Sequence, residues 1–371
     1  MKVSFLISSL ITLVFISDVI HAQDDENPLV RKYSNEFLAI GVGARAMGMA
    51  NTFVTTADDV TAGYWNPAGL TRIDSDIQGG LMHAEIFAGM LKYDYGAVAK
   101  RIDSVSTIGI SFIRMGVDDI PNTVDLIDNQ GNFDYDRITS FSVADNALLL
   151  SYARQTGIPG LNIGANFKVI HRIIGSFAKA WGFGLDVGAQ YKYKKWRFGA
   201  VLRDATSTFN AWSYNLPDNM VETFIATGNV IPENSMEITT PTLIGGVQRT
   251  FEIRERFTIG AEANLIFTFD GMRNTLVKTN FASIDPSAGL EIGYLNIVFL
   301  RAGVGNFQRY TTIEDFEKTT SSVQPNVGMG VKYKGVAIDY ALTNVGELSD
   351  VMFSNIFSLR FDINSKKKKT N

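Results

Sequence analysis

The sequence predicts an all-β protein, a transmembrane up-and-down antiparallel β-barrel of about 14 strands with an N-terminal helical or irregular hatch in its lumen. Three observations favour this fold class. Apolar and polar residues alternate with a period of two over long segments, the last such segment is rich in aromatic residues, and a Gly- and Ala-rich stretch near the N-terminus has neither the strand nor the helix period. The 371 residues would also suffice for two ordinary domains, so the fold class is inferred from the alternation of residues and not from the length.

The composition agrees with a membrane barrel and excludes several other functions. Charged residues make up 19% of the chain and aromatic residues 11%, whereas a typical soluble domain has roughly a quarter charged residues. The net charge of -4 argues against a nucleic-acid partner, which requires a basic face. The chain has no Cys, and this excludes disulfides, thiolate chemistry and Cys-based metal sites.

Residues 1–22 are typical of a secretory signal peptide. Met1 and Lys2 precede an apolar run over residues 3–16, and the small residue Ala22 stands before a polar segment. An uncleaved anchor is the alternative, but the run is shorter than the ~20 residues of a spanning helix. We therefore expect cleavage after Ala22 and export to the outer membrane of a Gram-negative bacterium.

Residues 23–72 are expected to form an N-terminal segment and the hatch, centred on 41–70, which reads GVGARAMGMANTFVTTADDVTAGYWNPAGL. Thr56 is a suitable N-cap, and two aspartates follow it where acids suit the positive end of a helix dipole. The sequence therefore predicts a short helix over 57–65.

A fixed kink should follow this helix. Pro67 disfavours helical angles at Asn66, and Gly69 would supply a flexible exit. Six residues are expected to fix the kink and anchor the hatch inside the barrel: Trp65, Asn66, Pro67, Ala68, Gly69 and Leu70.

The barrel itself is expected over 73–363, and its clearest strands are 161–169, 181–193 and 257–270. In each of them one face is apolar while the other carries Gly, Asn, Thr and single charges. Soluble strands average about five or six residues, whereas an outer-membrane strand needs about nine to eleven. The length and the polar face therefore favour a membrane barrel over a soluble sandwich.

Further segments complete the predicted barrel. They are 76–86, 90–101, 104–115, 142–154, 196–205, 239–251, 286–294, 296–305, 323–333, 336–345 and 353–363. The short links 194–195 and 334–335 are typical of periplasmic turns. Four longer links are expected to be extracellular loops: 116–141, 206–238, 271–285 and 306–322.

The final strand, 353–363, resembles the aromatic strand by which barrels are recognised for membrane insertion. Residues 364–371 continue past it with four consecutive lysines, and we expect a basic periplasmic tail.

No enzymatic site is expected. His171 lies on an apolar strand face whose neighbours include no Ser, so a girdle position is favoured over a phospholipase nucleophile system. His83 and Glu85 share a strand face, but two ligands at that spacing are common by accident. The sequence predicts no catalytic residue, no metal and no cofactor.

Two motifs identify a family resemblance. Asn66-Pro67-Ala68 resembles the hatch element of FadL-type outer-membrane transporters, and the wider GARAMGMANTFV…DDVTAGYWNPAGL resembles the opening of the PorV/PorQ branch of that superfamily. The segment 114–123, RMGVDDIPNT, resembles the segment after the third strand in PorV-type proteins.

The resemblance implies two alternative functions. PorV-like proteins are non-enzymatic barrels of type IX secretion that bind exported cargo with C-terminal signal domains at the translocon and pass it to the cell-surface attachment machinery. FadL-like proteins transport hydrophobic small molecules. The hatch does not choose between these functions, while the PorV-like form of the motifs favours the first.

The partners expected from this resemblance are outer-membrane lipid and lipopolysaccharide, the translocon and its cargo, or a hydrophobic ligand. Candidate partner-binding residues lie in two predicted loops: Asp118, Asp119, Ile120, Pro121, Asn122, Trp212 and Tyr214. The acidic loop could instead hold calcium or be merely solvated. The aromatic loop 206–238 could fold over the barrel mouth or bind a protein. The sequence shows no apolar pocket beside a basic clamp, although four arginines could serve: Arg203, Arg249, Arg273 and Arg309.

Overall fold

The computed structural model describes residues 32–87, 89–127, 131–312, 315–345 and 353–364. The predicted signal peptide and all but the first residue of the predicted basic tail lie outside these ranges. Within them, no helix is both long enough and apolar enough to cross a membrane.

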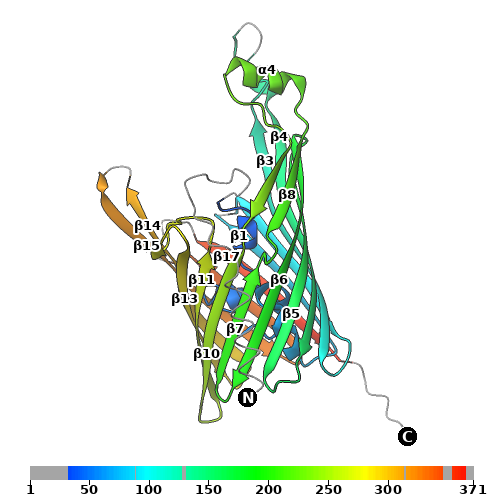
Figure 1. The fold of residues 1–371 in the computed structure, drawn as a ribbon, viewed down its shortest axis with the longest axis vertical. Helices are drawn as coiled ribbons and strands as arrows, with labels where there is room; N and C mark the ends of the chain where they lie inside the picture. Colours follow the sequence, from blue (N-terminus) through cyan, green and yellow to red (C-terminus); the bar gives the residue numbers. More distant parts are fainter. Residues whose placement is uncertain (1–31, 88, 128–130, 313–314, 346–352, 365–371) are drawn as a thin grey trace.

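A closed antiparallel barrel of 14 strands forms the body of the molecule (Figure 1). Each strand pairs with its neighbour along the chain, apart from short insertions, and β17 closes the barrel on β1. The barrel strands are β1 (Ile77–Ile86), β2 (Leu91–Arg101), β3 (Ser106–Asn122), β4 (Thr139–Gln155), β5 (Leu161–Ile174), β6 (Ala178–Tyr193), β7 (Trp196–Arg203), β10 (Thr242–Ile253), β11 (Phe257–Thr268), β13 (Ser283–Tyr294), β14 (Val298–Thr312), β15 (Asp315–Tyr333), β16 (Val336–Thr343) and β17 (Ser354–Ile363). Each predicted strand corresponds to one of these, so the predicted fold class is confirmed.

The predicted long loops contain more regular structure than expected. The interior of 206–238 forms β8 (Thr208–Tyr214), α4 (Asp218–Ala226) and β9 (Ser235–Thr239), and 271–285 contains the short β12 (Val277–Lys278). β7 ends at Arg203, and the upper half of β6 then pairs with β8 instead. Backbone pairing therefore continues beyond the predicted strand ends wherever a partner is available.

Residues 117–127, 131–141 and 206–238 form a projection that we call the tower (Figure 1). Its β3–β4 part also contains η3 (Tyr135–Arg137), and Asn219 of α4 donates to Asp125 at 2.9 Å. α4 has no buried residue and stands far above the barrel. The expectation that this loop folds over the barrel mouth is therefore wrong.

The upper parts of β14 and β15 also leave the wall. β13 pairs with β14 only between Ala288/Val304 and Tyr294/Val298, and β15 pairs with β16 only from Val327 downward. Above these pairs β14 and β15 continue as a two-stranded ribbon, which Figure 1 shows leaning away from the barrel. The predicted loop 306–322 is thus largely a strand ribbon.

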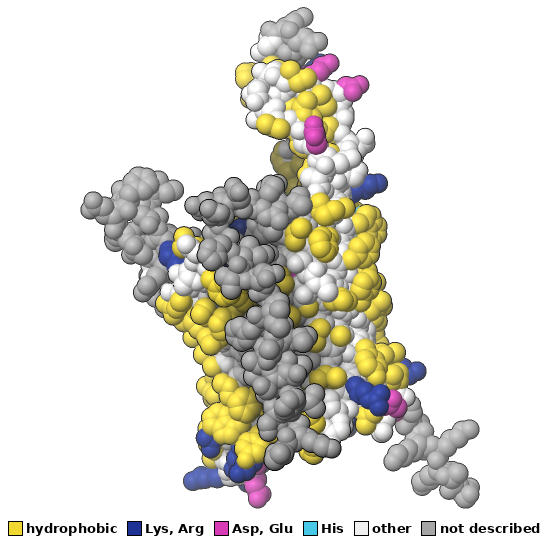
Figure 2. Space-filling view, viewed as in Figure 1, with side chains coloured by type: hydrophobic (Ala, Val, Ile, Leu, Met, Phe, Trp, Pro, Cys, Tyr) yellow, Lys and Arg dark blue, Asp and Glu magenta, His cyan; other side chains and the backbone are white. Residues whose placement is uncertain are grey.

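The outer surface of the wall is apolar, as membrane-spanning strands require (Figure 2). On β6, Trp181, Phe183, Leu185 and Val187 are exposed, while the alternate residue Asp186 is buried in the lumen. The polar faces of the strands therefore point inward and surround the hatch.

The hatch fills the lumen and provides most of the apolar core. Its elements are η1 (Glu36–Leu38), α2 (Ala44–Met47), α3 (Ala62–Trp65) and η2 (Pro67–Arg72). The predicted helix over 57–65 is wrong in its first half, since only α3 is helical. The Thr56 hydroxyl donates to Glu262 of the barrel rather than capping a helix, and the two aspartates that follow form ion pairs.

Candidate functional site: the hatch and the cavity above it

Asn66 fixes the kink between α3 and η2. Its backbone is extended, with φ -161° and ψ 102°, which is the region that a following proline favours. Its side chain accepts a hydrogen bond from the Ala68 amide at 3.2 Å and donates to the carbonyls of Val54 and Ala189, both at 3.0 Å. One side chain thus connects the kink, an earlier hatch segment and β6.

Gly69 is a packing residue and not the flexible exit that the sequence suggested. It is buried within η2, and a Cβ at this position would lie 2.2 Å from the Ala57 carbonyl oxygen. Gly164 of β5 likewise leaves no space, because its Cβ would lie 2.5 Å from the Ala68 amide nitrogen. The kink therefore fits the wall only where both surfaces lack side chains.

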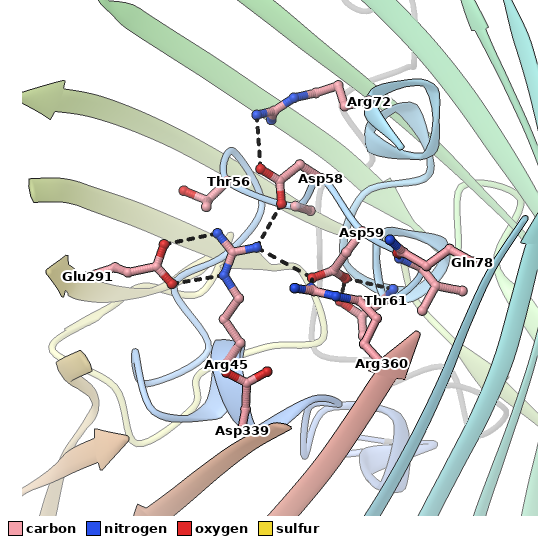
Figure 3. Close-up of polar contacts among 12 residues, drawn as sticks. Arg45, Thr56, Asp58, Asp59, Thr61, Arg72, Gln78, Glu291, Asp339 and Arg360 are labelled. Carbon is pink, nitrogen blue, oxygen red and sulfur yellow. Dashed lines mark hydrogen bonds and ion pairs between the residues drawn. The ribbon is translucent and has the colours of Figure 1, made fainter. Parts of the chain in front are cut away.

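Arg45 is the centre of an ion-pair network that holds the hatch to the wall, which we call the latch (Figure 3). Its guanidinium donates two hydrogen bonds to the Glu291 carboxylate of β13, at 2.9 and 3.0 Å, and one to Asp58 at 2.7 Å. Asp59 accepts from both Arg45 and Arg360 of β17. Since Glu291 and Arg360 belong to the wall, the latch joins the hatch directly to the barrel.

Further charges surround the latch. Arg301 of β14 donates to Glu291 and to Asp339 of β16, both at 2.7 Å, and Arg72 donates to Asp58 at 3.3 Å. Each buried charge in this cluster thus has an opposite charge beside it, as burial requires.

The pKa of Asp58 shows the strength of this pairing. Burial alone would raise the pKa of the carboxyl group, but the guanidinium groups of Arg45 and Arg72 outweigh burial and hold the pKa well below its ordinary value. Asp58 is therefore ionised at neutral pH.

Glu262 of β11 holds the other side of the hatch. Its carboxylate accepts the backbone amides of Thr55 and Thr56, at 2.8 and 2.9 Å. The hatch segment before the kink is therefore fixed by backbone hydrogen bonds as well as by ion pairs.

A cavity of about 160 Å³ lies above the hatch, and we call it the upper cavity. Its lining includes the apolar side chains of Leu38, Val54, Tyr64, Trp65, Ile244 and Ile266. Trp65 is held by a hydrogen bond from its indole nitrogen to the Val42 carbonyl at 2.9 Å, and its ring packs edge-on against Tyr64 at 4.8 Å. The cavity therefore has a rigid aromatic wall.

Arg203 of β7 lies against this aromatic wall. Its guanidinium is 4.6 Å from the Tyr64 ring centre and 5.6 Å from that of Trp65. It forms no ion pair within the described chain, whereas nearby Lys168 pairs with Asp186 at 2.8 Å and with Asp204 at 2.5 Å. Arg203 is thus the cation of the cavity without a paired carboxylate.

The N-terminal segment 33–38 covers the upper cavity. Asn35 donates to Thr239 of β9 at 2.7 Å, and Arg273 donates to Glu36 at 2.9 Å. These contacts attach the segment to the long-loop end of the barrel, and the buried side chain of Phe37 holds it from below, so access to the cavity depends on this segment.

A second and larger space of about 1060 Å³ lies below the hatch, at the short-turn end, and we call it the lower vestibule. Polar and charged side chains line it, including Asp58, Arg72 and Arg197. Arg197 forms no ion pair within the described chain. The hatch therefore separates a small, partly apolar cavity from a wide polar one.

The structure places the six predicted hatch residues together in the lumen, all of them buried: Trp65, Asn66, Pro67, Ala68, Gly69 and Leu70. Of these, Trp65 lines the upper cavity. The kink thus begins directly after a residue that lines the upper cavity.

The predicted partner-binding residues form two separate groups. Asp118, Asp119, Ile120, Pro121 and Asn122 lie on the upper part of β3, whereas Trp212 and Tyr214 lie on β8. Asp118 pairs with Lys92 at 3.3 Å, and the Trp212 indole donates to Glu237 at 2.8 Å. No hydrogen bond or ion pair joins the two groups within the described ranges.

The two histidines of the predicted barrel have other partners than a metal. His83 bonds Asp94 at 2.7 Å on the outer face, and His171 stacks on Trp181 at 4.1 Å. Among the residues that the structure describes, no group of three or more His, Asp or Glu could hold a metal ion.

Sequence reasoning missed the latch and identified Arg203 only as one of four possible clamps. Arg273 also lines the upper cavity, Arg249 faces outward, and the Arg309 side chain lies outside the described part. The available signal for the latch was the presence of single charges on the polar faces of β13, β14 and β16. The pattern did not show which of these charges meet.

No protein-family model matches the chain, and no curated protein matches its sequence. The fold does match solved structures. The CymD monoaromatic hydrocarbon channel has a TM-score of 0.57 at 13% identity, covering 88% of this chain and 98% of that one. The toluene transporter TbuX of Ralstonia pickettii has a TM-score of 0.53 at 12% identity, covering 87% and 99%. A FadL homologue of Pseudomonas aeruginosa has a TM-score of 0.50 at 13% identity, covering 86% and 98%.

At these identities the likeness establishes the fold. None of the three proteins is a PorV-type protein, so the resemblance to that branch stays a prediction. The chain therefore has the same barrel fold as these three outer-membrane transport proteins.

Proposed function

We propose that this chain is an outer-membrane transporter that binds a small hydrophobic molecule in the upper cavity. The observation that carries the proposal is the size and wall of this cavity, about 160 Å³ beside Tyr64 and Trp65. An apolar cavity of about 150 Å³ can hold benzene in another protein. A compact aromatic molecule is therefore the ligand class that fits. The structural likeness to channels for toluene and other monoaromatic hydrocarbons supports this choice.

The inward face of β7 runs from the upper cavity to the lower vestibule, and the hatch blocks it in the middle. This face carries Arg203 in the upper cavity, Gly199 in the middle and Arg197 in the lower vestibule. The hatch presses on Gly199, where a Cβ would lie 2.7 Å from the Val54 carbonyl oxygen. A ligand in the upper cavity can therefore reach the vestibule only if the hatch shifts, and the latch opposes this shift.

Type IX secretion is a second candidate function, and the tower would be its protein-binding surface. The described surface of the tower includes exposed apolar residues, among them Val230 at 89% and Ile225 at 66% exposure. Exposed apolar patches of this kind are typical of protein-binding surfaces. In this case the translocon and cargo would bind the tower and the hatch would stay closed.

Toluene binding to the purified protein in detergent tests the transport proposal. Trp65 is the tryptophan of the cavity, so we expect a saturable change in its fluorescence. Ile266→Phe should fill part of the cavity and weaken binding at least tenfold, while Trp181→Phe on the outer face should leave the affinity unchanged. A response that does not saturate, or that persists unchanged in both variants, would contradict the proposal.

Affinity purification from solubilised outer membrane separates the two candidates. A barrel that arrives alone with a small apolar compound supports transport. Recovery of a large translocon, or of secreted proteins that share a C-terminal domain, would support secretion instead.

A further inference from the structure

A groove of about 700 Å³ runs over the lipid-facing side of β10, β11, β13 and β14. Its floor consists of small outward-facing side chains: Ala261, Ala263, Ala288 and Ala302. In the sheet register Leu290 lies between Ala261 and Ala302, whereas Val304 and Phe251 belong to the two outermost strands of the groove. Because the surrounding wall carries large apolar residues, this row of alanines leaves a depression wide enough for an acyl chain.

Arg249 of β10 lies at one end of this groove and faces outward, as do Val247 and Phe251 on the same strand face. Its guanidinium lies between two aromatic rings, 4.9 Å from the centre of Trp196 and 4.8 Å from that of Phe251. It forms no ion pair within the described chain, and its buried Nε has no hydrogen-bond partner there. A guanidinium without a counter-charge on a lipid-facing strand is costly, so it favours an anionic acceptor at its terminal nitrogens, since the buried Nε is closed to an outside group.

The position of Arg249 along the strand indicates which acceptor is available. β10 ends at Ile253, four residues after Arg249. With a rise of ~3.3 Å per residue along a strand tilted as in other barrels, the Arg249 backbone lies about 10 Å from the short-turn end, measured along the barrel axis. Trp196 begins β7 at the same level, as expected for an aromatic girdle. Arg249 therefore lies where the phosphate groups of the leaflet at that end are found.

We propose that this groove binds one phospholipid of the periplasmic leaflet, with its phosphate at Arg249 and one acyl chain along the alanine floor. A guanidinium binds phosphate through two parallel hydrogen bonds, and Trp196 and Phe251 fix its orientation. The one carboxylate in the groove lining, Glu262, bonds Thr55 and Thr56 on the lumen side, so the outer face beside Arg249 is electrostatically complementary to a phosphate group. This lipid site is on the outside of the wall and is separate from the upper cavity.

Native mass spectrometry of the delipidated protein tests the proposal. The probes are phosphatidylethanolamine and a diacylglycerol with the same acyl chains. We expect one phosphatidylethanolamine to be retained at least tenfold more tightly than the diacylglycerol. Equal retention of the two would overturn the assignment and leave only a nonspecific apolar surface.

Two variants address the two parts of the site. Arg249→Gln removes the phosphate partner, and Ala288→Leu fills the groove from an exposed position where folding is undisturbed. Both should lower phosphatidylethanolamine retention at least fivefold. Arg154→Gln is the matched control, since Arg154 is an exposed arginine near the same end of β4. If Arg249→Gln behaves like this control, Arg249 only extends to the interface and the proposal is wrong. Toluene binding should be unchanged in all three variants.

Discussion

At the residue scale, Arg45 connects more of the molecule than any other latch residue, because it bonds Glu291 on the wall and two hatch carboxylates at once. Removing one partner of a buried ion pair costs roughly 3–5 kcal/mol, whereas an exposed pair contributes about 0–1 kcal/mol. The exposed pair of Arg137 with Asp134 at 3.1 Å provides a comparison within the same chain.

We expect Arg45→Met to loosen the hatch and not the barrel. Amide hydrogen exchange over 44–65 should rise at least tenfold, and toluene should cross more rapidly, while the barrel keeps its heat-modifiable migration on gels. Arg137→Met should leave all three readouts unchanged. Unchanged exchange in Arg45→Met would show that packing, and not the latch, holds the hatch.

Asp58 predicts how the latch responds to acid. Its folded-state pKa lies below its ordinary value, so the unfolded chain binds the proton more tightly. The stabilisation is therefore present above the unfolded pKa and is lost only as the pH falls through the folded value. Hydrogen exchange over 44–65, corrected for intrinsic rates, should be the same at pH 8 and pH 5. Loosening between these values would show that another group controls the hatch.

At the scale of elements, Pro67 tests the kink. Pro67→Ala places another small apolar side chain at this position but removes the steric restriction that keeps the Asn66 backbone extended. We expect faster hydrogen exchange over α3 and η2 and an altered toluene affinity, with the heat-modifiable barrel intact. Loss of the folded barrel would instead make the motif a folding element.

Strands were easier to predict than the hatch, for a physical reason. Alternation along 161–169 reflects a local requirement, namely that one face meets lipid and the other meets the lumen. No such local requirement fixes the segment 57–65. Just before it, the backbone amides of Thr55 and Thr56 donate to Glu262, and within it Asp58 accepts from Arg45 of the latch. Helix-capping reasoning failed there since Thr55 and Thr56 bond to a strand that lies more than 200 positions later.

The same limit applies to the candidate site. The motif at Asn66 and Pro67 identified the kink, because a proline acts on its direct neighbour. Arg203 is separated from Tyr64 by 139 positions, and a single sequence contains no sign of that contact. The upper extensions of β3 and β14 were missed because a register shift between Val117 and Ile120, and another between Gly305 and Gln308, interrupts the alternation, so only backbone pairing marks them as strands.

At the scale of the whole molecule, the tower and the hatch are separable. Asn122 pairs directly with Thr139, so an Asn-Gly turn can replace residues 123–138 and close the β3–β4 hairpin. None of the described residues of this stretch, 123–127 and 131–138, lines the upper cavity. We expect the shortened protein to fold and to bind toluene with unchanged affinity. A weaker affinity would show that the tower shapes the cavity, and loss only of co-purifying proteins would support a partner at the tower.

The latch also sets an order of events during biogenesis. Arg45 and Glu291 are 246 positions apart, and Asp59 and Arg360 are 301 apart. The hatch is therefore made early, whereas its ion-pair partner on β13 follows much later and its partner on β17 belongs to the final strand. Contacts between such distant positions form slowly, because the intervening loop must close first. Until the final strand pairs with β1, the charges of the hatch must stay hydrated or be covered by another protein. Formation of the complete latch therefore marks the end of barrel assembly.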